Sequence, residues 1–524
     1  MSISRRRFCH AALLGGLTAP FIKGHSLFAD TTAEPVKQST VLTLLHTNDP
    51  HGRVYLPEEA YGLTRVATLV RQIRQEMPNV LLLDAGDLIH GTPEERAFAG
   101  QPMIEAMNAL QYDVATAGNH EFDFGQRITR QALGRANFPI LSANILDEQT
   151  GKPWHSLKPY IMREVDGMRI AIFGLTTVDT VKIQFPHTLE GIRFADPITT
   201  ARELVPHLRT QERADLVVFL SHLGYLSDRA LAESVSGIDI ILGGHSHNRI
   251  PDQKWVNGTL IMQTGYFCRA LGRADVLLQR LDNGRVQVKI NGQNNAWWGR
   301  NGVEAPLGKN YPNAPLIDVN TETPHDPAVR EAYLPYATTM QKRRDEILAT
   351  RTTALPIGKP KEEQSEMGRL LADAVRAKFS VDVALVPSGA IAKGLPAGAV
   401  RVSDALSTIS GYTRQHIVTA RVTGHALRTF CETAFTPTAY KAQISGIAPA
   451  QKPLSLNGEE LKDDAVYTVA GAAYLIQDDF LGQDGTVILT DDPEAPTTRD
   501  ALIEYLRTQG NKNSQKEVSG NQFY

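Results

Sequence analysis

The sequence has little cysteine and no long apolar or basic run. Its three cysteines, Cys9, Cys268 and Cys431, form no CxxC pair and are too few for a disulfide framework. We expect Cys268 and Cys431 to be inert buried thiols, with one disulfide between them as the alternative. No apolar stretch approaches the roughly 20 residues that a membrane-spanning helix needs. The formal charge of -3, without a basic stripe, argues against a nucleic-acid polymer as partner.

The length of 524 residues exceeds what one hydrophobic core usually organises, so two domains are expected. With 42% apolar and 21% charged residues, the composition is that of an ordinary globular protein. We place one domain at residues 34–325, a connector helix at 326–350 and a second domain at 351–524.

The first 33 residues are predicted to be an export signal. Ser4-Arg5-Arg6-Arg7-Phe8 precedes a short apolar stretch, the order of basic and apolar regions found in secretion signals. The segment resembles a twin-arginine signal, and a chance basic N-terminus is the alternative. We therefore expect a periplasmic protein without a stable membrane anchor, exported by the twin-arginine machinery. Such signals carry proteins that fold before export, which suits an enzyme that loads its metal in the cytoplasm.

Short β-branched apolar runs alternate with amphipathic stretches through the first half, which predicts an α/β domain. The expected buried strands span residues 41–45, 80–83, 170–173, 216–220 and 238–242. Asp326-Pro327 supply a cap and a first position for the connector helix. A second α/β pattern follows it, with helices expected at 367–378 and 425–434.

Polar clusters follow the predicted strands, mostly beside a glycine or a tight turn. They are Asp49-Pro50-His51, Gly86-Asp87, Gly118-Asn119-His120-Glu121, Ser221-His222 and Gly243-Gly244-His245-Ser246-His247. Loops at the carboxyl ends of strands in α/β domains converge on one crevice. A lone histidine there is more often a hydrogen-bonded loop residue than a ligand. Clusters in this order, however, resemble the pattern of dinuclear metallophosphoesterases, so the sequence predicts a metal site.

The residue types suit a pair of divalent cations. The carboxylates of Asp49 and Asp87 only partly neutralise two such cations, and the surplus positive charge attracts a phosphate. The neutral side chains expected to fill the other positions are His51, Asn119, His222, His245 and His247. Two metals roughly 3.5 to 4 Å apart can hold a hydroxide nucleophile and polarise phosphoryl oxygens. Mixed nitrogen and oxygen ligands suit Mn, Zn, Co or Fe without choosing among them.

His120 directly follows Asn119, so it can face the site without being a ligand. Asp123, three residues further on, could orient the His120 ring and favour the imidazolium, or act only as a helix cap. We expect His120 to stabilise charge in the transition state or to donate a proton to the leaving oxygen.

Nearly the whole mature chain resembles the secreted 5'-nucleotidase and UDP-sugar hydrolase family. The motifs that carry the likeness include residues 44–52, 86–92, 118–125, 221–224, 243–247 and 367–374. The resemblance implies two domains. The N-terminal one would be the catalytic domain, a β-sandwich flanked by helices (α/β/β/α), and the smaller C-terminal α/β domain would bind substrate. The resemblance also implies two metal sites that share Asp87. One would use Asp49, His51, Asp87 and His247, and the other Asp87, Asn119, His222 and His245.

The C-terminal half departs from the family at the substrate pocket. The family usually has Asn-Gly-Gly-Gly-Ile-Arg where this chain has Pro387-Ser388-Gly389-Ala390-Ile391-Ala392, so the arginine that contacts substrate is missing. Lys393 is adjacent but lacks the bidentate fork of an arginine. The candidate substrate-binding residues are Arg369, Lys393, Tyr412, Tyr474, Phe480 and Asp484. Tyr474 and Phe480 could equally be core residues.

Three functions are compatible with these features. The first is a periplasmic hydrolase of nucleotide phosphate esters that uses a metal-bound hydroxide. The second is a hydrolase whose altered pocket takes a cyclic nucleotide, a UDP-sugar, another organophosphate or a sulfur-oxoacid conjugate. The third is a metal-stabilised binding protein without turnover, and the complete set of strand-end clusters argues against it.

Overall fold

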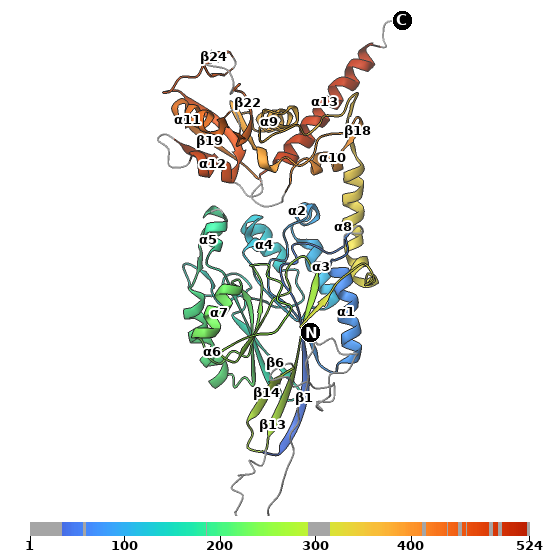
Figure 1. The fold of residues 1–524 in the computed structure, drawn as a ribbon, viewed down its shortest axis with the longest axis vertical. Coiled ribbons are helices and arrows are strands. Elements are labelled where there is room, and N and C mark those ends of the chain that lie inside the picture. Colours follow the sequence, from blue (N-terminus) through green and yellow to red (C-terminus); the bar gives the residue numbers. More distant parts are fainter. Residues whose placement is uncertain are drawn as a thin grey trace, which may run out of the picture.

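A computed structural model of the protein has two α/β halves that follow each other along the chain (Figure 1). The residues described are 34–55, 59–184, 186–291, 315–410, 416–436, 439–448, 453–456, 458–480, 486–490 and 495–520. The expected export signal, Tyr412 and Asp484 lie outside these ranges. Within them, no helix combines the length and the apolar character needed to cross a membrane.

The first half contains two β-sheets. One has the strand order β14-β13-β1-β2-β3-β4, with β15 also paired to β13. Its strands are β1 Val36–Thr47, β2 Val80–Asp84, β3 Val114–Thr116, β4 Ile140–Leu141, β13 Ala270–Leu281, β14 Val286–Ile290 and β15 Leu316–Asp318. The other has the order β11-β12-β10-β9-β7-β6. Its strands are β6 Tyr160–Val165, β7 Met168–Thr176, β9 Leu216–His222, β10 Ile240–Gly243, β11 Lys254–Val256 and β12 Thr259–Met262.

All the strands expected in this half are present, and each begins and ends within five residues of the predicted limits. β1, β2, β3 and β4 are parallel neighbours, and so are β7, β9, β10 and β12. The short strands β5 Ile145–Asp147 and β8 Ile192–Phe194 pair with each other outside the two sheets. Parallel strands in a sheet direct their carboxyl ends toward the same edge, which is where the polar clusters follow.

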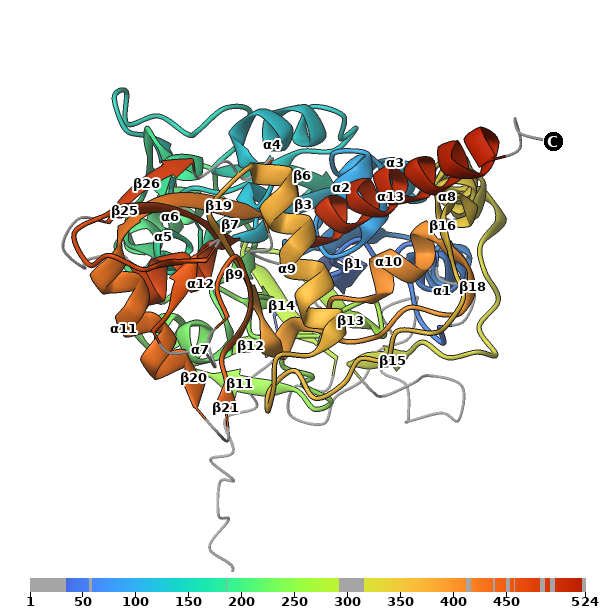
Figure 2. The same cartoon turned by 90° about the horizontal axis from the view of Figure 1, so that it is seen from above.

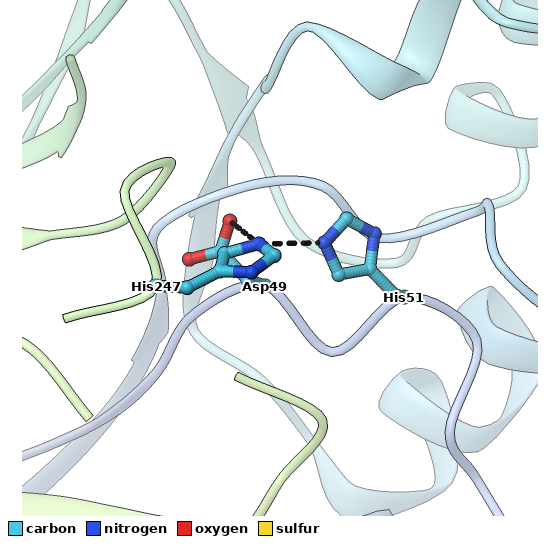
Figure 3. Close-up of side chains that lie close together, drawn as sticks. All are labelled: Asp49, His51 and His247. Atoms are coloured by element: carbon cyan, nitrogen blue, oxygen red, sulfur yellow. Dashed lines mark hydrogen bonds and ion pairs between the residues drawn. The ribbon is translucent and has the colours of Figure 1, made fainter. Parts of the chain in front are cut away.

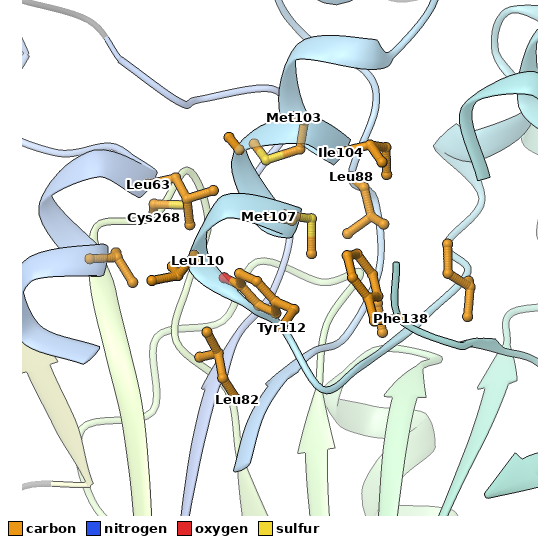
Figure 4. Packing of buried hydrophobic residues seen from close by; sticks show 14 of the residues in the cluster. Leu63, Leu82, Leu88, Met103, Ile104, Met107, Leu110, Tyr112, Phe138 and Cys268 are labelled. Carbon is orange, nitrogen blue, oxygen red and sulfur yellow. The ribbon is translucent and has the colours of Figure 1, made fainter. Parts of the chain in front are cut away.

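Side chains from both sheets meet in a shared apolar layer that includes Leu44, Leu83, Ile172 and Leu220. Helices cover the outer faces, giving the α/β/β/α order expected from the sequence. The helices of this half are α1 Leu63–Glu76, α2 Pro93–Ala97, α3 Gln101–Leu110, η1 His120–Phe122, α4 Gly125–Leu133, α5 Thr180–Ile183, η2 Pro186–Leu189, α6 Pro197–Thr210 and α7 Tyr225–Ser234. Figure 4 shows the packing of α3 on the first sheet, with Met103 and Met107 above Leu82.

The second half is built on one smaller sheet with the order β22-β17-β25-β19-β26. Its strands are β17 Val383–Pro387, β19 Ile417–Thr423, β22 Ala442–Ser445, β25 Val466–Ala472 and β26 Val487–Thr490. Its helices are α9 Glu366–Phe379, η4 Ser388–Ala390, α10 Val402–Ser407, α11 Gly424–Ala434, α12 Ala473–Phe480 and α13 Thr498–Gly520. Short pairs join β16 Ile347–Arg351 to β18 Gly398–Arg401, β20 Phe435–Thr436 to β21 Ala439–Tyr440, and β23 Ser455–Leu456 to β24 Glu459–Glu460.

The two faces of this smaller sheet are covered by different helices. α9 and α13 lie side by side and pack with α10 on one core, whereas α11 and α12 cover the other. Seen from above, α9, α10 and α13 lie over the first half (Figure 2). Helices α9 and α11 confirm the two helices expected in this part of the chain.

The connector helix is shorter than expected. Helix α8 spans Pro327–Asp345, and its capping residue Asp326 accepts a hydrogen bond from Val329 N at 2.9 Å. The expectation of helix up to residue 350 was wrong, because Ile347–Arg351 instead pairs with β18. The β-branched and apolar side chains there suit a strand as well as a helix. Val329 and Tyr333 are buried in the core of the first half, so α8 packs as part of it.

Cys268 and Cys431 are both buried and both free. Cys268 packs in the core of the first half, and Cys431 packs in that of the second. The alternative of a disulfide between them was therefore wrong, and the expectation of buried thiols is confirmed.

Candidate metal centre

The strand-end clusters converge on one point of the first half. Asp49 and His51 follow β1, Asp87 follows β2, and Asn119 follows β3. From the second sheet, His222 ends β9, while His245 and His247 follow β10. Groups of these side chains approach closely enough to share a metal ion, namely Asp49, His51 and His247, and Asp49, Asp87 and His222. The structure therefore brings together all seven residues that the sequence singled out as ligands.

One side of the cluster is formed by Asp49, His51 and His247, which face one another (Figure 3). Nε2 of His51 lies 3.0 Å from Nε2 of His247 and 3.9 Å from Oδ2 of Asp87. Nε2 of His247 lies 3.5 Å from Oδ1 of Asp49. Asp49 and His51 are buried, whereas His247 is exposed, so this side opens to solvent.

The other side is formed by Asp87, Asn119, His222 and His245. Nε2 of His222 lies 3.2 Å from Oδ1 of Asp87 and 3.1 Å from Oδ1 of Asn119. Nδ1 of His245 lies 2.8 Å from the same Asn119 oxygen. Because Asp87 contacts residues of both sides, it stands where the family resemblance implied a shared carboxylate.

The donor atoms fit a cation. Nδ1 of His222 lies 2.7 Å from the carbonyl oxygen of Ala85, which can only accept, so Nδ1 carries a proton. In the neutral ring, Nε2 then has a bare lone pair that faces oxygens of Asp87 and Asn119. A lone pair facing these oxygens is favourable only if a proton or a metal cation lies between them. In the absence of metal, the ring takes a second proton at Nε2. Burial lowers the pKa of His222, but the nearby Asp87 carboxylate outweighs burial and raises this pKa to about 10. A divalent cation would meet the same requirement.

The backbone at the site is held in unusual conformations. Asp49, His51, Asp87, His245 and His247 all have positive φ angles, between 47° and 70°. Few residues other than glycine adopt this region, and such residues cluster at functional sites because the surrounding structure must hold them there. Close packing adds to the constraint, since a Cβ at Gly118 would lie 2.1 Å from Oδ1 of Asp87.

His120 and Asp123 are placed as the sequence predicted. Nδ1 of His120 lies 2.9 Å from both carboxylate oxygens of Asp123, and the His120 backbone N–H donates to Oδ1 of Asp87 at 2.9 Å. Burial alone would lower the pKa of His120, but Asp123 and Asp87 outweigh it and raise the pKa to about 10. Asp123 is therefore more than a helix cap, because it binds the ring of His120.

Three residues at the site were missed or given no role by the sequence. Glu121 accepts backbone N–H bonds from Gly118 at 2.5 Å and Leu88 at 2.5 Å, and so ties two ligand loops together. Gln184 donates to Asp123 at 2.5 Å, and His90 stacks on His120. Glu121 was quoted only as part of a motif. Gln184 lies in a distant loop, and no sequence motif near it points to the site. The only hint in the sequence for His90 was its position three residues after Asp87.

The candidate substrate-binding residues of the second half are dispersed. Arg369 lies exposed on α9, in a hollow that it shares with Arg351 and Asp373, and Lys393 is exposed beyond η4. Tyr474 is half-buried against the core. Phe480 is fully buried against Phe430, with ring centroids 4.9 Å apart, so it is a core residue and offers no face to a ligand.

A cavity of about 560 Å³ lies between the two halves. Its first-half wall includes His90 and Phe124, and its second-half wall includes Leu406, Arg499 and Ile503. Next to it, Arg96 of α2 donates to the carbonyl oxygen of Ala495 at 3.0 Å. His90, which lines the cavity, contacts the candidate ligand His51, so a molecule bound in the cavity would contact both halves close to the candidate metal centre.

Each half of the chain matches a known protein family. Residues 42–249 match the calcineurin-like phosphoesterases, and residues 347–487 match the 5'-nucleotidase C-terminal domain. The chain is 30% identical to a 5'-nucleotidase of Vibrio parahaemolyticus over 438 residues, which cover 76% of this chain and 74% of that protein. It is 29% identical to a 5'-nucleotidase of Vibrio vulnificus over 539 residues, covering 94% of this chain and 92% of that protein.

Solved structures agree on the fold. A 5'-nucleotidase precursor of Thermus thermophilus has a TM-score of 0.58 and 24% identity, with 90% of this chain and 97% of that chain covered. An NAD nucleotidase of Haemophilus influenzae has a TM-score of 0.55 and 22% identity, with the same coverage.

Fold and site together define a calcineurin-like phosphoesterase, an enzyme class that uses a dinuclear metal centre. Within that class the chain belongs to the 5'-nucleotidase family, in which a second, C-terminal domain follows the catalytic one. The family and the enzyme class expected from the sequence are thereby confirmed.

Proposed function

We propose that this phosphoesterase is a periplasmic, metal-dependent hydrolase of nucleotide phosphate esters. The observation that carries the proposal is the convergence of Asp49, Asp87, Asn119 and four histidines from two sheets on one point. Bound there, two divalent cations would activate the attacking water and polarise the phosphoryl oxygens.

The protein's own side chains would divide the remaining work. Asp87 lies between the two sides of the cluster and would hold both cations, while Asn119 and the four histidines add no negative charge. The site would thus keep a positive charge that attracts phosphate. His120, protonated and oriented by Asp123, would stabilise charge on the phosphoryl group or donate a proton to the leaving oxygen.

A nucleotide substrate is supported by the names of the relatives and by the position of the cavity. Proteins that match along both halves are called 5'-nucleotidases. The cavity between the halves has walls from both, so a molecule held by the second half would lie beside the first half near His90. We accordingly assign catalysis to the first half and substrate binding to the second, near the domain limits inferred from the sequence.

One difference from the family's usual substrate-binding sequence favours a second candidate substrate class. Ala392 stands where the family usually has a substrate-binding arginine, so this position offers no bidentate partner for phosphate or carboxylate. Two lysines lie near this position: Lys393 is adjacent in the sequence, and Cε of Lys361 lies 3.7 Å from the position of a Cβ at Gly389. Such a pocket favours a cyclic nucleotide, a UDP-sugar or another ester with different contacts.

A substrate panel decides between these candidates. Chelator-stripped protein would be supplied with Mn²⁺, Zn²⁺ or Co²⁺ and offered nucleoside monophosphates, cyclic nucleotides, UDP-glucose and a sulfate ester. We expect no turnover without metal and the highest kcat/KM on a nucleoside monophosphate. Equal turnover by the stripped protein would refute metal dependence, and preference for another ester would assign the second candidate.

Export can be tested at the N-terminal motif. The Arg5→Lys, Arg6→Lys double variant keeps the positive charge but removes the arginine pair. We expect it to accumulate in the cytoplasm, while the wild type and the Arg7→Lys control reach the periplasm. Normal periplasmic yield of the double variant would refute export by the twin-arginine route.

A further inference from the structure

The loop after β2 places an additional histidine between two parts of the site. His90 is only 5% exposed. Its ring meets that of His51 edge-on at 5.3 Å and stacks on that of His120 at 4.4 Å, with 11° between the planes. Its Nδ1 lies 3.2 Å from Nδ1 of His51, and its Nε2 lies 3.1 Å from Oδ2 of Asp123. One ring therefore contacts both a candidate ligand and the His120–Asp123 pair.

The contacts of His51 decide where its proton lies. Nε2 of His51 faces the ligand cluster, 3.0 Å from Nε2 of His247. As a metal ligand His51 would be neutral and bind through Nε2, so its proton would be on Nδ1. That N–H has His90 Nδ1 as its acceptor, at 3.2 Å.

The contact with His51 also decides which ring nitrogen of His90 carries the proton. A neutral His90 ring carries one proton, on either Nδ1 or Nε2. Because Nδ1 accepts from His51, the proton is on Nε2, beside the Asp123 carboxylate. Within the described residues this buried Nε2 has no hydrogen-bond partner, and Oδ2 of Asp123 lies 3.1 Å from it. The contact is thus an electrostatic one between an N–H dipole and a carboxylate.

We propose that His90 is a positioning residue, which holds His51 as the Nδ1–H tautomer with Nε2 toward the metal site and braces Asp123 under His120. The inference rests on the proposed function, since it takes His51 as a ligand and His120 as the residue acting on the phosphate. It adds a physical link between the two: the same ring orients a ligand on one edge and the acid pair on the other. Hydrogen-bonded partners behind ligating histidines set ring orientation and basicity in this way.

Two substitutions separate this role from simple space filling. His90→Phe keeps a flat ring against His120 but removes both nitrogens. His90→Gln loses the ring but offers a carbonyl acceptor to His51 and an N–H donor to Asp123. Both would be made in the full-length protein and compared with the wild type by Mn²⁺ titration of chelator-stripped samples, followed by electron paramagnetic resonance. kcat and KM for p-nitrophenyl phosphate would be measured at saturating Mn²⁺.

We expect His90→Phe to weaken the binding of one Mn²⁺ and to lower kcat by roughly 10- to 100-fold, the usual effect of losing such a partner. KM for this small ester should change less than kcat, because in this role His90 acts on His51 and Asp123. His90→Gln should regain most of both losses. The inference is wrong if His90→Phe matches the wild type, or if His90→Gln is as impaired as His90→Phe. Wild-type protein that binds no Mn²⁺ would instead refute the proposed function, and this inference with it.

A measurement on the wild type covers the case in which His90→Phe does not fold. In ¹⁵N-histidine-labelled, Zn²⁺-loaded protein, two-bond proton–nitrogen spectra distinguish protonated, bare and metal-bound ring nitrogens. We expect His51 to be protonated at Nδ1 and metal-bound at Nε2, and His90 to be bare at Nδ1 and protonated at Nε2. Loss of individual signals in His51→Gln and His90→Gln assigns them. A His90 ring protonated at Nδ1 would overturn the inference.

Discussion

His120 binds the Asp123 carboxylate through Nδ1, at 2.9 Å from each oxygen. This geometry commits one ring nitrogen to the protein and leaves Nε2 as the group that can reach a substrate. Burial disfavours the charged ring, but the carboxylates of Asp123 and Asp87 outweigh burial and raise its pKa to about 10. The imidazolium is thus the form present at neutral pH, and it can donate a proton or stabilise negative charge.

Replacing His120 should impair chemistry and spare metal binding. We expect His120→Ala to lower kcat by roughly 10²- to 10⁴-fold, the range for removing a general acid. Bound metal, measured by elemental analysis, should stay at the wild-type level, because Nδ1 of His120 is held by Asp123 and His120 is not one of the seven candidate ligands. The control is His425→Ala, an exposed histidine on α11. Loss of metal in His120→Ala would make His120 a ligand instead.

The pH profile should depend on Asp123. Activity that needs the imidazolium of His120 is present below its pKa and is lost as pH rises through it. Two bound cations would repel the imidazolium, so we expect the alkaline limb of kcat/KM below pH 10 in the wild type. Asp123→Asn removes a carboxylate that raises this pKa, which should move the limb to lower pH at unchanged metal content. An unmoved limb would mean that another group is titrating.

Much of the site could be predicted because its residues stand at recognisable points of the sequence. Asp49, Asp87, Asn119 and His222 each end or follow an apolar run, and parallel strands bring such points to one edge. The family resemblance implied how the ligands divide between two metals, which stays a prediction, and the distances bring the seven residues together. The sequence could therefore predict which residues come together where polar side chains follow strand ends.

The remainder depended on tertiary contacts that no local pattern encodes. Gln184 reaches Asp123 from a loop far along the chain, and its neighbours carry no motif. Phe480 lies next to the expected pocket in sequence but points into the core. The end of α8 was misplaced because Ile347 and its neighbours suit a strand as well as a helix, and only the pairing with β18 decides.

Asp87→Asn should disturb both sides of the cluster. Asp87 contacts His51 on one side and His222 on the other, so loss of its charge weakens the attraction for both cations. We expect turnover to be abolished and both metal equivalents to be held more loosely in equilibrium dialysis. The matched control is Asp252→Asn, an exposed aspartate in the loop before β11. A variant that kept two equivalents of metal and near-normal kcat would refute the shared carboxylate.

The division of labour between the halves can be tested with a fragment. The sequence suggested a limit at residue 325, but Val329 and Tyr333 of α8 are buried in the first-half core. A fragment of residues 34–345 keeps that packing, whereas 34–325 exposes the surface that α8 covers, at a cost of about 1.5 to 3 kcal/mol for each large apolar side chain uncovered. We expect 34–325 to melt at a lower temperature than 34–345.

The 34–345 fragment should bind two metals, because every candidate ligand lies before residue 248. It should hydrolyse p-nitrophenyl phosphate weakly and discriminate little among leaving groups, since the wall of the cavity that includes Leu406 and Arg499 is absent. Full-length protein should exceed it in kcat/KM by a much larger factor on the best natural substrate than on the artificial ester. A fragment that retained the full-length kcat/KM on that natural substrate would show that the second half does not determine specificity.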